Sequence, residues 1–217
     1  MASPWNFLFH DWYMSGQADE EFAKDHLVKT ALSLFASLGY DGTDNEMIAN
    51  AAGVDRQEVA AAGGRTALYL GILETFYQAQ SKMLDEAAAA FTPDEAGIRD
   101  LFDRMLDFYV DHLPQMALWQ HRYLHDAADI ADIDTRYRMP MLRKIADVFG
   151  TEALTPAGVQ MLLNFVSWSL RGFLSEGVIR LEGPPLGPDT VEGQNLLRSY
   201  LHELASLVFS EDRLRDR

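Results

Sequence analysis

Two histidines at helical spacing are the first residues in this sequence whose types could support chemistry. His121 and His125 are four residues apart in a stretch that is predicted to be helical, so both rings could share one face and bind a metal, with Asp126 and Asp129 following. The glutamate of a zinc-protease helix is absent. Two histidines on a polar helix face are commonly solvated, so we expect no metal site.

Other residue patterns that support catalysis are missing. No serine or carboxylate motif makes a catalytic set, and Gly63 and Gly64 lack the flanking pattern of a phosphate-binding loop. The absence of cysteine excludes disulfides and thiolate metal sites. We therefore expect a binding protein with no cofactor, and not an enzyme.

The segment that would position binding residues is predicted to contain three short helices and the start of a long one. In the first helix, which Gly39 should end, apolar residues recur at helical spacing: Leu27, Ala31, Leu34, Phe35 and Leu38. Thr43 and Glu46 have the spacing of a capping box at the start of a second helix, and Gly53 should end that helix. Asp55 can cap a third helix. Two short helices around such a turn predict a helix-turn-helix.

This segment resembles the N-terminal domain of the TetR family of one-component repressors. The resemblance rests on ALSLFASLGY, on the threonine and IANAAGV of TDNEMIANAAGV, and on ALYLGILETF. It implies an all-α, TetR-like fold with a C-terminal helical bundle. We expect an aromatic N-terminal extension over residues 1–22, a helix-turn-helix domain over 23–66, and a ligand-binding and dimerisation domain over 67–217.

The residues that the resemblance implies for DNA contact are few: Thr43, Arg56, Gln57 and Arg65. The aromatic positions that bind phosphates in the family are alanines within the run VAAA at 59–62, and Glu46 stands where the family often carries arginine. From Met1 to Gln80 there are four basic residues against eleven acidic residues, a net charge of −7. DNA-binding domains usually show a basic face, so this balance weakens the DNA hypothesis without removing it.

The N-terminal extension is unusually apolar. Its aromatic and leucine residues are Trp5, Phe7, Leu8, Phe9, Trp12 and Tyr13. They could fold back over apolar surface of the body or the dimer partner, or they could dock another protein. No positive charge precedes Lys24, so we expect no signal peptide.

Helix boundaries in the remaining chain are marked by threonine, proline and glycine. Thr66 is predicted to cap a long helix, and Thr92 to cap a second one with Pro93 in its first turn. A later helix should be kinked or restarted at Pro140 and end at Gly150. The last two long helices should begin at Thr155 and at Thr190, and they are separated by a loop rich in proline and glycine.

A small-molecule pocket within the body helices is implied by the resemblance. Aromatic and methionine residues with a few polar tips would line it: Met105, Phe108, Tyr109, His112, Met116, Trp119, Tyr123, Phe165 and Trp168. Such a lining suits a small apolar or aromatic ligand. Plain core packing is the alternative for each residue taken alone.

The last two long helices carry apolar residues over more than one face, which favours a homodimer. In the resembled family this helix pair forms a four-helix interface. The residues assigned to it are Ser167, Ser169, Gly172, Ser175, Leu197, Tyr200, Leu201 and Leu204. The alternative is burial of both helices within one chain.

Composition and charge limit the partners. The chain has 217 residues, 48% hydrophobic content and a formal net charge of −15, which disfavours nonspecific association with nucleic acid or anionic membrane. No apolar run is long enough to span a membrane, so we expect a cytoplasmic protein. Two hypotheses remain: a homodimeric, ligand-responsive regulator that binds operator DNA, or a protein of the same fold that has lost DNA binding and serves as a small-molecule, lipid or protein-partner module.

Overall fold

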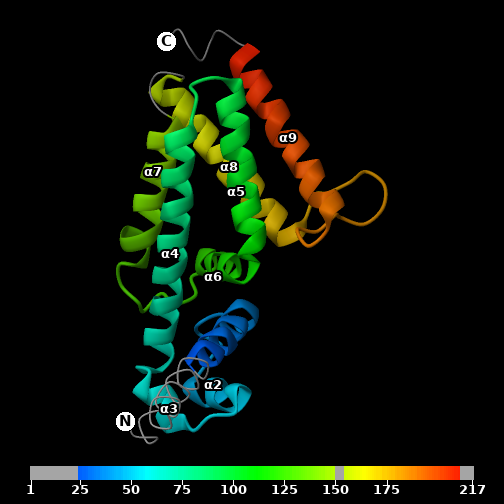
Figure 1. The fold of residues 1–217 in the computed structure, drawn as a ribbon. Helices are drawn as coiled ribbons and strands as arrows, with labels where there is room; N and C mark the ends of the chain where they lie inside the picture. The colour runs from blue at the N-terminus through cyan, green and yellow to red at the C-terminus, as the bar shows by residue number, and fades with distance from the viewer. Residues whose placement is uncertain (1–23, 150–153, 211–217) are drawn as a thin grey trace, which may run out of the picture. The chain divides into compact units, whose positions relative to one another are not determined.

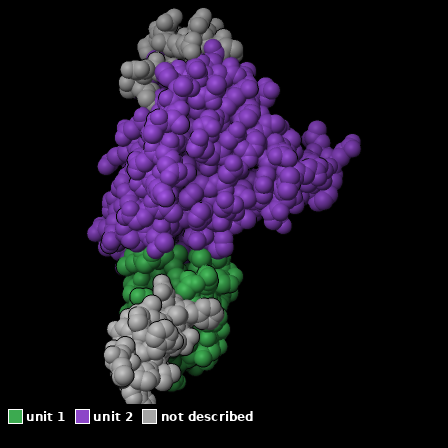
Figure 2. All heavy atoms as spheres, viewed as in Figure 1, with its two compact units in different colours: residues 1–72 green, residues 73–217 purple. Residues whose placement is uncertain are grey.

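The structure, a computed structural model, describes residues 24–149 and 154–210. The described residues are helical and carry only an isolated antiparallel bridge between Val178 and Leu186, so the predicted all-α fold is confirmed (Figure 1). The chain divides into two compact units, residues 1–72 and 73–217 (Figure 2). The aromatic extension predicted over residues 1–22 and the helix end predicted at Gly150 lie outside the described residues.

The first unit contains the predicted helix-turn-helix. A helix over residues 24–38 precedes α2 (Asn45–Ala52) and α3 (Arg56–Ala61). As predicted, Gly39 and Gly53 follow their helices with left-handed φ values of 77° and 67°, which glycine adopts without a Cβ penalty. The core of this unit includes Phe35, Tyr40 and Tyr69, whose rings lie 5.0 to 6.2 Å apart.

The predicted roles of two threonines in this unit are wrong. Asp44, not Thr43, caps α2, because its side chain accepts a hydrogen bond from the Met47 backbone N–H at 2.8 Å. The Thr43 hydroxyl is buried and donates to the Gly39 carbonyl at 2.7 Å. Thr66 does not cap the long helix α4 (Gly64–Ala90), which begins two residues earlier, and its hydroxyl bonds to that of Tyr40 at 2.7 Å.

The second unit is a bundle formed by the rest of α4 and the helices that follow. Helix α5 (Glu95–Asp111) packs against α9 (Val191–Ser210), and α8 (Pro156–Glu176) packs against α7 (Met139–Phe149) and α6 (Leu113–Tyr123). Thr155 and Thr190 begin α8 and α9 as predicted, because each hydroxyl accepts a backbone N–H three residues later at 3.1 Å. Large buried side chains at the centre include Leu101, Phe102, Phe149 and Leu162.

A five-residue π-helix, η1 (Asp134–Arg138), leads directly into α7. The helix type therefore changes at Met139, one residue before Pro140, where the sequence predicted a kink or a restart. The Met139 backbone N–H bonds to the Asp134 carbonyl five residues earlier, which gives the wide turn of a π-helix. Because η1 precedes α7 without a break, the side chain of Arg138 enters the bundle next to the α7 residues that line its interior.

The N-cap of helix α5 lies two residues later than the predicted cap at Thr92. Asp94 is the N-cap, and its carboxylate accepts hydrogen bonds from the Gly97 backbone N–H and the Thr92 hydroxyl, both at 2.8 Å. Asp94 caps the helix in place of Thr92, because its side chain reaches the free N–H groups of the first turn and its charge complements the helix dipole. The bonds from Gly97 and Thr92 hold the pKa of Asp94 below its ordinary value of 3.8.

We expect the Asp94 cap to make a pH-dependent contribution to the free energy of unfolding. A lowered folded-state pKa means that the contribution is complete above the ordinary carboxyl range and disappears as pH falls through the folded-state value. We expect Asp94→Ala to lower Tm at pH 7, and we expect the difference from wild type to shrink below pH 3.8. Thermal melts followed by circular dichroism across that range measure this difference. Asp147→Ala, an exposed carboxylate within α7, is the control and should leave Tm unchanged.

Candidate functional site

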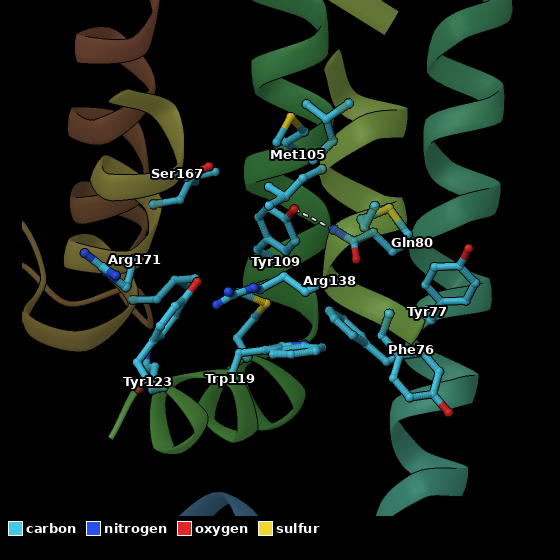
Figure 3. A pocket seen from close by; sticks show the side chains of 18 residues that line it. Phe76, Tyr77, Gln80, Met105, Tyr109, Trp119, Tyr123, Arg138, Ser167 and Arg171 are labelled. Carbon is cyan, nitrogen blue, oxygen red and sulfur yellow. Dashed lines mark hydrogen bonds between the residues drawn. The ribbon is translucent and has the colours of Figure 1, made fainter. Parts of the chain in front are cut away.

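A cavity lies inside the second unit, between α4, α5, α6, η1, α7 and α8 (Figure 3). Its volume is about 110 Å³. On the same measure a single water needs roughly 10–15 Å³, so the cavity can hold a small molecule. Its lining is mostly aromatic, aliphatic and methionine side chains with a few polar groups: Phe76, Tyr77, Gln80, Met105, Tyr109, Met116, Trp119, Gln120, Tyr123, Tyr137, Arg138, Met141, Leu142, Ile145, Ser167, Leu170, Arg171 and Leu174. This is the composition of a small-molecule site.

A neutral hydrogen-bonded pair lies on the α4 and α5 side of the cavity. The Gln80 side-chain amide donates to the Tyr109 hydroxyl at 2.6 Å, and both residues are buried (Figure 3). Burial raises the pKa of Tyr109 and that of Tyr137, so both phenols remain protonated at neutral pH. This part of the cavity therefore offers apolar surface and neutral polar groups.

Positive charge enters the cavity around Tyr123. The guanidinium carbon of Arg171 lies 4.8 Å from the centre of the Tyr123 ring, and that of Arg138 lies 5.5 Å from it. Figure 3 shows the Tyr123 ring between these two guanidinium groups. Tyr123 is 44% exposed, so this end of the cavity opens toward solvent.

The structure places five of the nine residues predicted for the pocket in the cavity lining: Met105, Tyr109, Met116, Trp119 and Tyr123. Phe108 and His112 do not line the cavity, because their rings stack on each other with centroids 4.2 Å apart and pack against Phe76. Phe165 and Trp168 are 46% and 55% exposed on the outside of α8. The lining residues from α4, η1 and α7 were not predicted from the sequence, nor were Gln120 of α6 and Leu170, Arg171 and Leu174 of α8, because core and cavity positions share one pattern.

Helices α8 and α9 each leave apolar side chains exposed. Phe165, Trp168, Gly172 and Ser175 follow one another at intervals of three or four residues on α8, which places them on one face. We call this set the α8 stripe. The rings of Phe165 and Trp168 meet edge to face with centroids 5.7 Å apart. On α9, Tyr200 and Leu207 are 52% and 62% exposed.

The residues predicted for the dimer interface therefore separate into groups. Gly172, Ser175 and Tyr200 are exposed, whereas Ser169 and Leu204 are half-buried. Ser167 lines the cavity instead. Leu197 and Leu201 are core residues with 5% and 2% exposure, because α9 turns that face toward α5.

Arg65 has a structural position in the first unit. One of its terminal nitrogens donates to the carbonyls of Tyr40 and Thr43 at 3.0 and 2.7 Å, and its guanidinium lies 4.2 Å from the Tyr40 ring centre. The side chain therefore ties the start of α4 to the segment before α2. Of the four residues predicted to contact DNA, Thr43 is buried and Arg65 is engaged in this way, whereas Arg56 and Gln57 are exposed on α3.

Apart from Arg56, the exposed charges at the starts of α2 and α3 are acidic. Asp44 and Glu46 belong to the start of α2, and Asp55 and Glu58 to the start of α3. Glu58 also accepts the Asp55 backbone N–H at 3.1 Å, so its carboxylate stabilises the helix that carries Arg56. The charge pattern read from the sequence is thus present at the surface of the described helix-turn-helix.

The two histidines considered for metal binding do not share a helix. Helix α6 ends at Tyr123, and His125 has a left-handed φ of 71° in the turn that follows. Two carbonyls within that turn, those of Asp126 and Ala127, accept hydrogen bonds from Arg122. No group of three or more potential metal ligands occurs within residues 24–149 and 154–210. Over the same residues, no helix has the length and apolarity needed to cross a membrane.

The fold has clear counterparts among solved structures. A TetR/AcrR-family transcriptional regulator from Aquifex aeolicus superposes with a TM-score of 0.64 at 17% identity, over 86% of this chain and 99% of that one. The TetR-family regulator PfmR from Thermus thermophilus gives 0.62 at 14% identity, over 84% and 94%. The ketosteroid transcriptional regulator KstR2 from Mycobacterium tuberculosis gives 0.63 at 17% identity, over 83% and 91%.

These neighbours define the class of the fold. No family model matches the sequence, and no curated protein matches it significantly. The similarity is therefore carried by the arrangement of helices and not by sequence identity. The chain has the fold of TetR-family transcriptional regulators.

Proposed function

We propose that this protein is a homodimeric, ligand-responsive transcriptional regulator that acts in the cytoplasm. The observation that supports this function most directly is the cavity in the second unit, in a chain whose first unit contains a helix-turn-helix. The three solved structures compared above are described as transcriptional regulators. The cavity would bind a ligand and would not catalyse a reaction.

The regulatory step follows from the two units. A small apolar or aromatic molecule in the cavity would favour the body conformation to which it binds more tightly, and this preference would shift the population of dimers toward that conformation. Operator DNA would favour another conformation through α2 and α3. The exposed side chains of Arg56 and Gln57 at the start of α3 are the ones we assign to DNA.

The α8 stripe supports the dimer part of the proposal. Its exposed aromatic side chains, together with Tyr200 and Leu207 of α9, give apolar area that a second copy of the chain would cover. Gly172 and Ser175 would allow close approach of a partner helix, because their side chains are small or absent. A dimer would set the spacing of the two helix-turn-helix units along a DNA duplex.

DNA selection followed by affinity measurement tests the function. Purified protein would be incubated with sheared genomic DNA of its source organism, and the retained fragments would be sequenced and measured by mobility shift at low and moderate salt. We expect a specific site, with Arg56→Ala weakening its binding at least about tenfold. Arg143→Ala, an exposed arginine on α7, is the matched control and should leave the affinity unchanged.

The acidic surface around α2 and α3 supports a second candidate function. Asp44, Glu46, Asp55 and Glu58 lie close in sequence to Arg56, and carboxylates there would repel phosphates. A protein of this fold that no longer binds DNA would use its cavity and dimer as a small-molecule, lipid or protein-partner module. Failure to retain any specific fragment, by a dimer that still binds a small molecule, would favour this second function.

A further inference from the structure

The cavity has an unexpected charge for this protein. The chain contains 33 acidic and 18 basic residues, yet the described residues that line the cavity include Arg138 and Arg171 and no aspartate or glutamate. A lining that followed the overall composition would contain more acids than bases. The lining of the cavity is therefore positively charged, whereas the chain as a whole is negatively charged.

Asp134 is the carboxylate that pairs with Arg138, and its charge does not offset both cavity arginines. Asp134 lies 3.1 Å from Arg138 and 3.1 Å from Arg122, so one negative charge is shared between two guanidinium groups. The Nε of Arg138 is buried and makes no hydrogen bond, although Asp134 is close to it. No ion pair involves Arg171 among residues 24–149 and 154–210. The region around Tyr123 thus keeps an excess of positive charge.

We propose, building on the ligand-responsive function above, that the ligand is an anionic amphiphile with a carboxylate head and an apolar body. Its head would pair with Arg138 and Arg171 at the open end, where it would displace the Tyr123 ring from its place between them, because guanidinium groups pair with carboxylates through charged hydrogen bonds. Its body would lie against Trp119, Met105 and Phe76, where the lining is apolar. At present both guanidinium groups contact the neutral Tyr123 ring. A bound carboxylate would replace these contacts with charged ones.

Three probes with the same chain and different heads test this inference: decanoate, decan-1-ol and decylamine. Isothermal titration calorimetry on the full-length protein at neutral pH gives the affinity of each one. We expect decanoate to bind most tightly and decylamine least, with at least about a tenfold difference between the acid and the amine. The alcohol reports the contribution of the apolar body alone.

Arginine variants assign the charge preference to the cavity. Arg138→Gln and Arg171→Gln should each weaken decanoate binding roughly 10- to 100-fold and leave decan-1-ol binding unchanged, since one charged hydrogen-bond partner is lost. Arg143→Gln removes a positive charge from α7 outside the cavity, and it should change neither affinity. The unchanged affinity for the alcohol shows that a variant keeps its cavity.

Each other result overturns the inference. If the amine or the alcohol binds as tightly as the acid, the ligand is not an anion, while the regulatory function stands if specific DNA is still bound. If no probe binds, the amphiphile is wrong, and the regulatory function is judged by DNA binding alone. If Arg138→Gln also loses binding of decan-1-ol, its cavity is damaged and the test depends on Arg171→Gln, because Arg171 is exposed. Unchanged decanoate binding by Arg171→Gln would then overturn the proposed head position.

Discussion

Trp168→Glu is expected to separate the proposed dimer into monomers. Trp168 is 55% exposed in the single chain and lies in the α8 stripe beside Phe165. A symmetric interface would contain two copies of the new carboxylate, each without a partner in an apolar contact. Burial of unpaired charge costs several kcal/mol, so dimer dissociation should become at least about 100-fold easier. Sedimentation velocity over a range of protein concentrations measures the change.

A matched substitution elsewhere separates loss of the dimer from loss of the fold. Leu38→Glu changes another exposed apolar residue, which is 47% exposed and lies outside α8 and α9. This control should remain dimeric. The circular dichroism spectrum of Trp168→Glu should match that of wild type, because the side chain contributes little to the core of its own chain. A Trp168→Glu protein that stays dimeric would show that the α8 stripe is not the interface.

Glu46→Lys is expected to increase the affinity for DNA by about tenfold or more at low salt. Glu46 is exposed in the first turn of α2, where its charge favours the helix dipole but would repel a phosphate. Each dimer carries two copies, so two repulsive charges become attractive. If each lysine neutralises one phosphate, the plot of log affinity against log salt concentration should steepen by roughly two. Fluorescence anisotropy with a labelled duplex gives both quantities.

The effect of Glu46→Lys must be distinguished from a general change in net charge. Glu182→Lys makes the same charge change in the loop between α8 and α9, and its effect on DNA affinity should be much smaller. A small loss of thermal stability is expected for Glu46→Lys, because a cation replaces an anion at a helix N-terminus. Equal gains from both variants would remove α2 from the proposed DNA contact.

Helix boundaries were largely predictable because they depend on local chemistry. Gly39, Gly53, Thr155 and Thr190 end or begin helices as the sequence indicates. The errors at Thr43, Thr66 and Thr92 have a shared physical cause. A threonine hydroxyl can cap a helix, but it can also bond to a nearby carbonyl, hydroxyl or carboxylate, and in each case a partner from the fold was available.

The direction that each helix face takes was harder to predict. Helical spacing correctly placed Phe165, Trp168, Ser167 and Leu197 on helices, but it does not specify what each side of an apolar helix meets. The large aromatic side chains of α8 point away from the cavity, whereas Ser167 lines it. Arg138 entered the cavity through a π-helix, and no spacing rule for α-helices predicts that turn.

Helix α8 has the cavity on one face and the α8 stripe on another. Ser167, Leu170, Arg171 and Leu174 line the cavity, and Phe165, Trp168, Gly172 and Ser175 lie on a different face of the same helix. Ligand binding and dimerisation form a closed thermodynamic cycle. A ligand that changes the dimer dissociation constant must therefore bind dimer and monomer with affinities that differ by a corresponding factor. Ligand affinity measured in dilute and concentrated protein solutions would then differ, and the ratio would give the energetic coupling across one helix.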